Sequence, residues 1–401
     1  MNKFLKLIVR NSQAPIWYSR ATNRSLFSNT HTNHVKTGVR FSSSASTMKV
    51  TILGGGGNVA KSVALMLKQT PLIDEVCLYD TKSLEGFAAD LNYIDTKCKV
   101  TSYLGPKDIQ HALSKATVVV VFACCQHSDS FTYSNLFDKN APIVKDLAGH
   151  ISKYAPKSLI AIGAEPINSM VPMFSEVMKK HGNYNPCTIF GVTTIDVVRT
   201  NRFVAEVLGL DPECVTVPVI GGHSEKTIVP VLSKAAPCNE LTNKELEDIT
   251  NSVRQADDNL MKIRSDGAYL SYGFSTARFV LALVKAAKGH CDVVECAFVK
   301  SNVHPQLKYM VTPLVLGPGG VVKNFGVPTL SDYEECLLEN AIPLLAEDIK
   351  KGEFVGGRPM RMVDGVMQPK PICDPCDPNP KAPRCPPNHC ELQSLFADKP
   401  C

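Results

Sequence analysis

The chain has 401 residues, of which 44% are hydrophobic and 20% are charged, a composition typical of a globular protein with room for two domains. No apolar run approaches the roughly 20 residues needed to cross a bilayer, so we predict no membrane span. Seven of the 43 basic residues lie between residues 3 and 40, and the remaining 36 are balanced by 38 acidic residues, so the near-neutral body argues against a nucleic-acid partner.

The first 48 residues have a composition of their own. They contain no Asp or Glu, are rich in Arg and Ser, and end in the sequence RFSSSASTM. This composition is typical of a mitochondrial transit peptide, and the alternative is a basic disordered arm. We therefore predict that residues 1–48 are a presequence, cleaved between residues 40 and 47 during import into the mitochondrial matrix.

From residue 49 onward, short β-branched runs alternate with segments of helical periodicity. The runs at 118–122 and 159–162 are apolar throughout, those at 50–53 and 75–79 are largely apolar, and helix-like segments such as 58–68 separate them. Strands that are apolar on both faces and alternate with helices predict a buried parallel sheet. The predicted fold class is α/β, with a Rossmann-type doubly wound parallel sheet over residues 49–192.

The second half has longer helical stretches, at 194–208, 243–264 and 277–288, with a closing helix over 331–351. Shorter strand-like runs lie between them, which predicts an α+β domain for substrate binding and dimerisation over residues 193–356. Beyond residue 356 the composition changes, and residues 369–401 contain nine prolines and five cysteines. Proline-rich sequence resists both helix and sheet, so we predict a disordered tail over 357–401.

The cysteines suggest reduced thiols. Ten of the fifteen lie between residues 77 and 336 without regular spacing, mostly in apolar runs, which favours buried thiols over a disulfide framework. In the tail, the alternatives are cross-linkable thiols and a zinc site, but the loop between the cysteine pairs is shorter than zinc modules use. The candidate ligands would be Cys373, Cys376, Cys385, His389 and Cys390, and we predict no metal site.

A glycine-rich turn follows the first predicted strand. The sequence GGGGNVA at 54–60 places Gly54, Gly57 and Ala60 in the pattern G-x-x-G-x-x-A at the start of a helix. Small residues there let backbone N–H groups and the helix N-terminus approach a pyrophosphate. Asp80 ends the second strand, where a carboxylate holds the ribose hydroxyls and repels a 2′-phosphate. The predicted cofactor is therefore NAD.

Several segments resemble the mitochondrial malate dehydrogenases, from residue 49 to about residue 354. They include IFGVTTIDVVR at 189–199, VIGGH at 219–223, VEC at 294–296 and TPL at 312–314. The resemblance implies NAD-dependent exchange of L-malate and oxaloacetate, a reaction of the tricarboxylic acid cycle. It also implies a homodimer, because residues 270–279 and the helix after Asn58 are similar to parts of the family's subunit interface.

The resemblance also implies roles for individual residues. His223 would shuttle the hydroxyl proton, Asp196 would orient it, Arg199 would anchor the C1 carboxylate of the substrate, and Asn140 would contact the cofactor. A neutral imidazole accepts a proton near pH 7, and a neighbouring carboxylate fixes its tautomer and stabilises the imidazolium.

Other positions depart from the family's pattern. Where the family carries the mobile-loop sequence G-V-P-R-K-P-G-M-T-R, the chain has His127 for the first Arg, which recognises the distal carboxylate, and Tyr133 for the second, which polarises the reacting carbonyl. Cys124 and Ser130 replace two loop glycines, which puts loop closure in doubt. Glu165 replaces the Asn that helps to orient substrate and nicotinamide, and its charge would repel a dianion.

These replacements predict that malate turnover is strongly reduced or lost. Removing one preorganised donor costs about 3 kcal/mol, or 10²–10³ in rate, and neither neutral His nor Tyr reproduces a bidentate Arg. Three hypotheses remain: a compensated malate dehydrogenase, a dehydrogenase for a different small 2-hydroxy or 2-oxo acid, and a paralogue that keeps the fold and serves as a structural or cofactor-binding component. The sequence favours the third.

Overall fold

The computed structural model describes residues 47–122, 133–237, 240–263, 267–357, 360–363 and 366–369. Its first half is a parallel sheet with the strand order β3-β2-β1-β4-β5-β6. This order reverses between β1 and β4, as in doubly wound dinucleotide-binding folds. The strands are β1 (Lys49–Leu53), β2 (Glu75–Asp80), β3 (Lys99–Leu104), β4 (Val118–Val121), β5 (Leu159–Ile162) and β6 (Ile189–Gly191).

Helices cover both faces of this sheet, which explains the uninterrupted apolar runs. In β4, Val118 and Val120 belong to one core cluster, whereas Val119 and Val121 belong to a second cluster on the opposite face. Successive strand residues point to opposite faces, so a strand covered on both sides must be apolar at every position. The first cluster is covered by α2 (Asn58–Lys68) and α3 (Glu85–Asn92), and the second by α4 (Gly105–Leu113), α5 (Tyr133–Tyr154) and α6 (Ile167–Lys180).

The second half extends the same sheet with antiparallel strands. Gly191 at the end of β6 pairs with Phe298 of β9, and the order continues β9-β10-β7-β8, with β11 paired to β10. The two predicted halves therefore share one mixed sheet and do not form separate ones. The added strands are β7 (Val219–Gly221), β8 (Ile228–Pro230), β9 (Val293–His304), β10 (Leu307–Gly317) and β11 (Gly320–Asn324).

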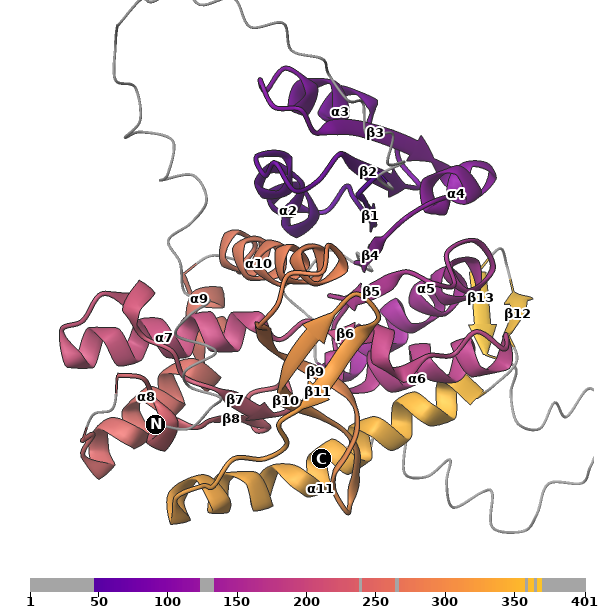
Figure 1. Ribbon diagram of the computed structural model, residues 1–401. Helices are drawn as coiled ribbons and strands as arrows, with labels where there is room; N and C mark the ends of the chain where they lie inside the picture. Colours follow the sequence, from indigo (N-terminus) through magenta and orange to yellow (C-terminus); the bar gives the residue numbers. More distant parts are fainter. Residues whose placement is uncertain are drawn as a thin grey trace, which may run out of the picture.

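The helices of the second half surround this extension (Figure 1). They are α7 (Thr194–Leu208), α8 (Asn243–Arg254), α9 (Ala256–Met261), α10 (Leu270–Ala287) and α11 (Asp332–Gly357), with short 3₁₀ turns η2 (Pro186–Thr188), η3 (Pro212–Cys214) and η4 (Leu232–Lys234). Helix α10 joins the first core cluster and packs along α2, while α11 packs along α6.

Three helix predictions need correction. The single helix expected over 243–264 is two helices, α8 and α9, that meet at Gln255. Helix α10 begins at Leu270 and not at residue 277; its first turns contain Gly273, a poor helix former, so the sequence pattern did not predict them. A Cβ on Gly273 would lie 2.4 Å from the Ser62 Cβ, so this face of α10 lies close against α2. Helix α11 continues past residue 351 to Gly357, since Gly352 and Gly356 press against the backbone of α6.

The region predicted as a tail begins with structure. Strands β12 (Met360–Val363) and β13 (Val366–Pro369) form an antiparallel pair beside α5. The Asp-Gly pair between these strands in the sequence is a strong hairpin signal that the proline content obscured. The tail prediction from residue 357 therefore began too early. The presequence up to residue 46, the loop 123–132 with His127, and residues 370–401 lie outside the described residues.

Within the described ranges, no helix is long and apolar enough to cross a membrane. The seven cysteines described there are all free. Cys77, Cys98 and Cys296 are buried as expected, but four others are exposed because they lie in turns, a loop and the outer side of a helix: Cys187, Cys214, Cys291 and Cys336.

Candidate functional site

The glycine turn between β1 and α2 has the shape that a pyrophosphate needs. Gly54 has φ +79, and a Cβ there would lie 2.1 Å from the Phe122 carbonyl oxygen, so only glycine fits. Gly57 precedes α2 and has no side chain to cap it, which leaves the N–H groups of the first turn to a ligand. Ala60 is buried against the sheet. All three predicted residues therefore fit a dinucleotide.

Asp80 lies at the carboxyl end of β2, beside this turn. Its Oδ2 accepts a hydrogen bond from the Gly56 N–H at 2.9 Å, and its Oδ1 accepts one from the Lys82 N–H at 3.2 Å. The carboxylate is thus held at the edge of the turn, where a ribose would lie. Gly56, which the motif did not single out, is part of this arrangement because a Cβ there would lie 3.0 Å from Asp80 Oδ2.

His223 is carried by a tight loop after β7. Gly221 has φ +92, and a Cβ on Gly222 would lie 2.3 Å from Leu345 Cδ2 of α11, so neither position accepts a larger residue without movement. The His223 N–H donates to Asn168 Oδ1 at 2.8 Å, and the amide of Asn168 donates to Asp348 Oδ2 at 3.0 Å. Helices α6 and α11 therefore fix the backbone that presents the imidazole.

Asp196 and His223 form a buried pair. Asp196 has no exposed surface, and its Oδ2 lies 2.7 Å from His223 Nδ1. Burial raises the pKa of Asp196, against the opposing effect of the His223 charge. Burial alone would lower the pKa of His223, but the charges of Asp196 and Glu165 outweigh it and hold this pKa well above its usual value of 6.5. The two carboxylates therefore favour the protonated form of the imidazole.

Glu165 occupies the other side of the imidazole. Its Oε1 lies 3.0 Å from His223 Nε2, the nitrogen that would face a substrate, and its Oε2 accepts a hydrogen bond from the Ile167 N–H at 3.1 Å. Asn140 is buried on α5 and donates its amide to the Glu165 carbonyl oxygen at 2.8 Å. The predicted cofactor residue Asn140 thus holds the segment that carries Glu165.

Arg199 lies on the same helix as Asp196, three positions later, and it is already paired. Its Nη1 donates to Asp257 Oδ2 at 3.0 Å, and its Nη2 donates to Asp257 Oδ1. Tyr272 donates its hydroxyl to Asp257 Oδ2 at 3.0 Å, and its ring centroid lies 5.4 Å from the guanidinium. Burial would raise the pKa of Asp257, but the hydrogen bonds and charge of Arg199 lower it below its usual value.

Comparison with known proteins identifies this arrangement. Two family models match in succession: lactate/malate dehydrogenase, NAD binding domain, over residues 48–191, and lactate/malate dehydrogenase, alpha/beta C-terminal domain, over residues 193–355. The chain belongs to the lactate/malate dehydrogenase family. Its first half is the NAD-binding domain of this family, and the predicted fold class is confirmed.

Relatives and solved structures of the family agree with this assignment. Mitochondrial malate dehydrogenases from Homo sapiens and Macaca fascicularis are each 43% identical over 316 residues, which covers 78% of this chain and 93% of theirs. Malate dehydrogenase from Cryptosporidium parvum matches with a TM-score of 0.66 at 22% identity, over 76% of this chain and 99% of that one. Lactate dehydrogenase from the same organism, complexed with lactic acid and nicotinamide adenine dinucleotide, matches with a TM-score of 0.66 at 21% identity, over 76% of this chain and 97% of its own.

The structure brings most of the predicted residues of this dehydrogenase-family site together. His223, Asp196 and Glu165 are in contact, and Arg199 joins them through Tyr272, whose hydroxyl lies 3.4 Å from His223 Nε2. His127 lies outside the described residues, and Tyr133 begins α5 without a described side chain.

Three residues of the site were missed from the sequence. The sequence did indicate Asn168, because it corresponds to the second Asn of the family segment N-P-V-N-S, and the chain retains that Asn. No sequence pattern indicated Asp257 or Tyr272, since they lie on α9 and α10 and meet Arg199 of α7 through tertiary contacts.

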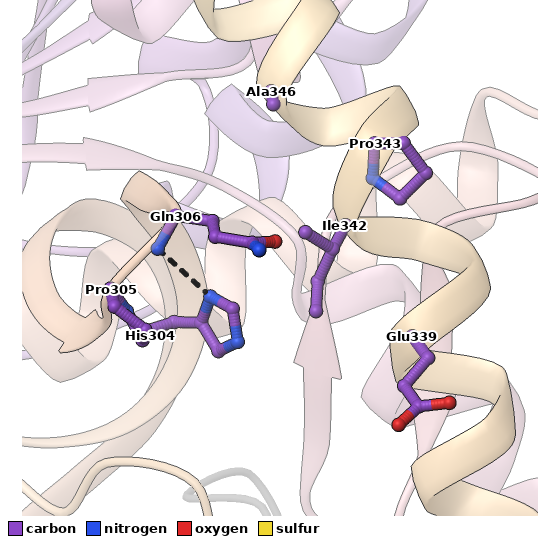
Figure 2. A pocket seen from close by; sticks show the side chains of 7 residues that line it. All are labelled: His304, Pro305, Gln306, Glu339, Ile342, Pro343 and Ala346. Atoms are coloured by element: carbon purple, nitrogen blue, oxygen red, sulfur yellow. Dashed lines mark hydrogen bonds between the residues drawn. The ribbon is translucent and has the colours of Figure 1, made fainter.

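A separate groove of about 570 Å³ lies between the β9–β10 turn and α11 (Figure 2). Figure 2 shows Gln306 pointing toward Ile342, with the Gln306 N–H bonded to His304 Nδ1 at 3.3 Å. Most of its lining is apolar or proline, and it shares no residue with the His223 site. The groove is therefore separate from the site around His223.

Proposed function

We propose that this chain is a mitochondrial, NAD-binding paralogue of malate dehydrogenase whose malate turnover is strongly reduced or lost. The observation that carries the proposal is the Glu165 carboxylate, 3.0 Å from His223 Nε2. In the family reaction this nitrogen exchanges a proton with the substrate hydroxyl, while the bound nicotinamide supplies or accepts hydride. A protein carboxylate at this atom competes with the substrate for it.

The charge of the site supports the same conclusion. Among the described residues of the site, the three carboxylates of Asp196, Glu165 and Asp257 face two cations, Arg199 and His223. Malate and oxaloacetate are dianions, so they gain little attraction here, and the two loop arginines that would balance their charge are absent from the sequence. A raised His223 pKa also disfavours the neutral imidazole that accepts a proton from malate.

The cofactor half of the site supports retention of NAD binding. The turn at Gly54 and Gly57 and the carboxylate of Asp80 have the geometry that the dinucleotide needs, and nothing in them depends on Glu165. We therefore expect cofactor binding and substrate turnover to be separable properties of this chain.

The decisive experiment measures both properties on the same preparation. Binding of NADH is followed by fluorescence, and oxaloacetate reduction by NADH absorbance. We expect NADH to bind, and turnover to lie orders of magnitude below the ~10 s⁻¹ typical of enzymes. Turnover near that value would contradict the proposal, and failure to bind NADH would restrict the chain to a structural role.

A second candidate function is an active dehydrogenase, and one observation favours it. The Asp196–His223 pair keeps its 2.7 Å hydrogen bond in a fully buried position. A panel of small 2-oxo acids in the same absorbance assay separates the candidates, because a dehydrogenase with altered specificity would reduce at least one of them rapidly.

Two further proposals concern assembly and location. Helices α2 and α10, similar to the family's interface segments, pack together and present exposed apolar side chains at Leu65, Leu270 and Phe274, which supports a homodimer. The acid-free N-terminus supports import into the mitochondrial matrix. Recovery of protein from mitochondria with an intact N-terminus would contradict the predicted cleavage.

A further inference from the structure

Arg199 is bound as if a substrate carboxylate were already present. Asp257 contacts both terminal nitrogens of the guanidinium, each through a different oxygen. This two-point geometry is the one by which arginine recognises a free carboxylate. The partner comes from α9, a separate short helix 58 positions along the chain from Arg199. The pair therefore depends on tertiary packing and is not a local helix contact.

The exposure of the two side chains shows how the pair is oriented. The Arg199 side chain is 11% exposed, whereas the Asp257 side chain is 46% exposed. Asp257 thus covers the guanidinium from its solvent side. A carboxylate arriving from solution must approach Arg199 from that same side, so it meets Asp257 first.

Tyr272 completes the obstruction. Its hydroxyl donates to Asp257 Oδ2 at 3.0 Å and lies 3.4 Å from His223 Nε2, and its ring faces the Arg199 guanidinium. A 2-hydroxy or 2-oxo acid needs its carboxylate on Arg199 and its oxygen on His223 at the same time. The phenol of Tyr272 spans the distance between those two groups.

We propose that Asp257, held by Tyr272, is an internal substitute for the substrate carboxylate, which closes the anion position at Arg199 to 2-oxo and 2-hydroxy acids and leaves the cofactor turn open. The inference rests on the proposed function, because it names the residue that excludes the family's substrate class. It makes Asp257 a specificity-determining residue that acts by competition for one arginine.

The competition favours the internal carboxylate. An external carboxylate would make the same two hydrogen bonds to Arg199, so the contacts themselves give it no advantage. It would also lose translational and rotational freedom on binding, which Asp257 has already lost on folding. Displaced Asp257 would then stay beside the bound anion and repel it. We therefore expect the wild-type chain with NADH to bind a monocarboxylate only weakly.

Oxamate, a small 2-oxo-acid analogue with one carboxylate, is a suitable probe because it has no distal carboxylate for the missing loop arginines. Its affinity for the full chain saturated with NADH is measured by fluorescence and calorimetry. The test variant is Asp257→Ala, and the matched control is Asp258→Ala. Asp258 is an exposed neighbour on the same helix, so its substitution removes the same charge without changing a contact to Arg199. A third variant, Asp257→Ala with Tyr272→Ala, also removes the bridging phenol.

We expect Asp257→Ala to tighten oxamate binding at least tenfold, a change of about 1.4 kcal/mol. Asp258→Ala should bind oxamate as the wild type does, and adding Arg199→Gln to Asp257→Ala should abolish the gain. Tight binding by the wild type would overturn the proposal. So would weak binding by both Asp257→Ala and the double variant, provided that each folds and binds NADH. Because oxamate binding requires no turnover, this failure is distinct from a failure of the proposed function.

Discussion

Replacing Glu165 by Gln should change how His223 holds its proton. The substitution keeps the size of the side chain but removes one of the two negative charges beside the imidazole. Asp196 would remain at Nδ1, 2.7 Å away, while Nε2 would face a neutral amide. Since burial opposes the charged imidazole, the pKa of His223 should fall towards its usual range.

The size of the effect follows from the exposure of the pair. Hydrogen bonds to charged groups contribute about 1.5–3 kcal/mol, and the Glu165 side chain is only 23% exposed, so we expect a loss of about 2 kcal/mol in unfolding free energy near neutral pH. The direction in which this loss of stability changes with pH follows from the raised pKa of His223. Its stabilising contribution is fully present below about pH 6.5 and is lost as the pH rises through the folded-state pKa. The difference between wild type and Glu165→Gln should therefore narrow towards alkaline pH.

Two measurements follow the change directly. Histidine side-chain NMR, with His223 assigned by substitution, reports the titration, and urea unfolding between pH 6.5 and 9.5 reports the free energy. Glu176→Gln is a matched control, because Glu176 is 24% exposed and pairs with Lys179, whose raised pKa keeps it charged across this range. That control should lose only about 0.5 kcal/mol, independent of pH. An identical His223 titration in wild type and Glu165→Gln would refute the reasoning.

Three other substitutions test the rest of the site. Asp80→Asn should weaken NADH binding about tenfold, measured by fluorescence. NADPH binding should weaken less, because the 2′-phosphate is no longer repelled by the carboxylate. Gly222→Ala should lower the unfolding free energy by about 1–3 kcal/mol through its clash with Leu345, whereas Gly86→Ala, with open space around its Cβ, should be neutral or stabilising in the same denaturation assay. Phe274→Glu should give a monomer by light scattering if α10 forms the predicted interface.

The sequence predicted those parts of the fold that local patterns determine. Helix α2 runs over 58–68 as expected, because the glycine turn sets where it begins and the amphipathic pattern sets which face is buried. The continuous apolar run at β4 correctly predicted a strand that is buried on both faces of the sheet. Helix α7 also matched, ending at Gly209 in the left-handed conformation. In each case the information lies within a few residues of the element.

The sequence did not predict contacts that depend on how helices pack. Glu165 was recognised as a misplaced charge, but only the structure brings it to His223 Nε2. Reading 243–264 as one helix hid the break at Gln255, after which Asp257 reaches Arg199. A single Asp on a polar stretch is most often solvated, so no pattern distinguished Asp257 from its neighbour Asp258.

Restoring catalysis should therefore take more than the family's missing residues. The first set of changes returns two arginines and one asparagine: His127→Arg, Tyr133→Arg and Glu165→Asn. These would supply donors for the distal carboxylate and the reacting carbonyl and remove the charge at His223, a gain of at least about 100-fold in kcat/KM. Arg199 would still hold Asp257, however, so the C1 carboxylate would lack its anchor.

Adding Asp257→Ala to that triple variant should raise kcat/KM for oxaloacetate again, by about tenfold or more, because Arg199 then becomes available. Asp257→Ala alone should raise it little, since without the loop arginines the bound acid is neither oriented nor polarised. The gains should thus be larger together than separately, as for residues that act on one ligand. Asp258→Ala in the triple background is the control. Equal rates for the triple and quadruple variants would mean that substrate displaces Asp257 without difficulty, and an inert quadruple variant that folds and binds NADH would place the defect in loop closure.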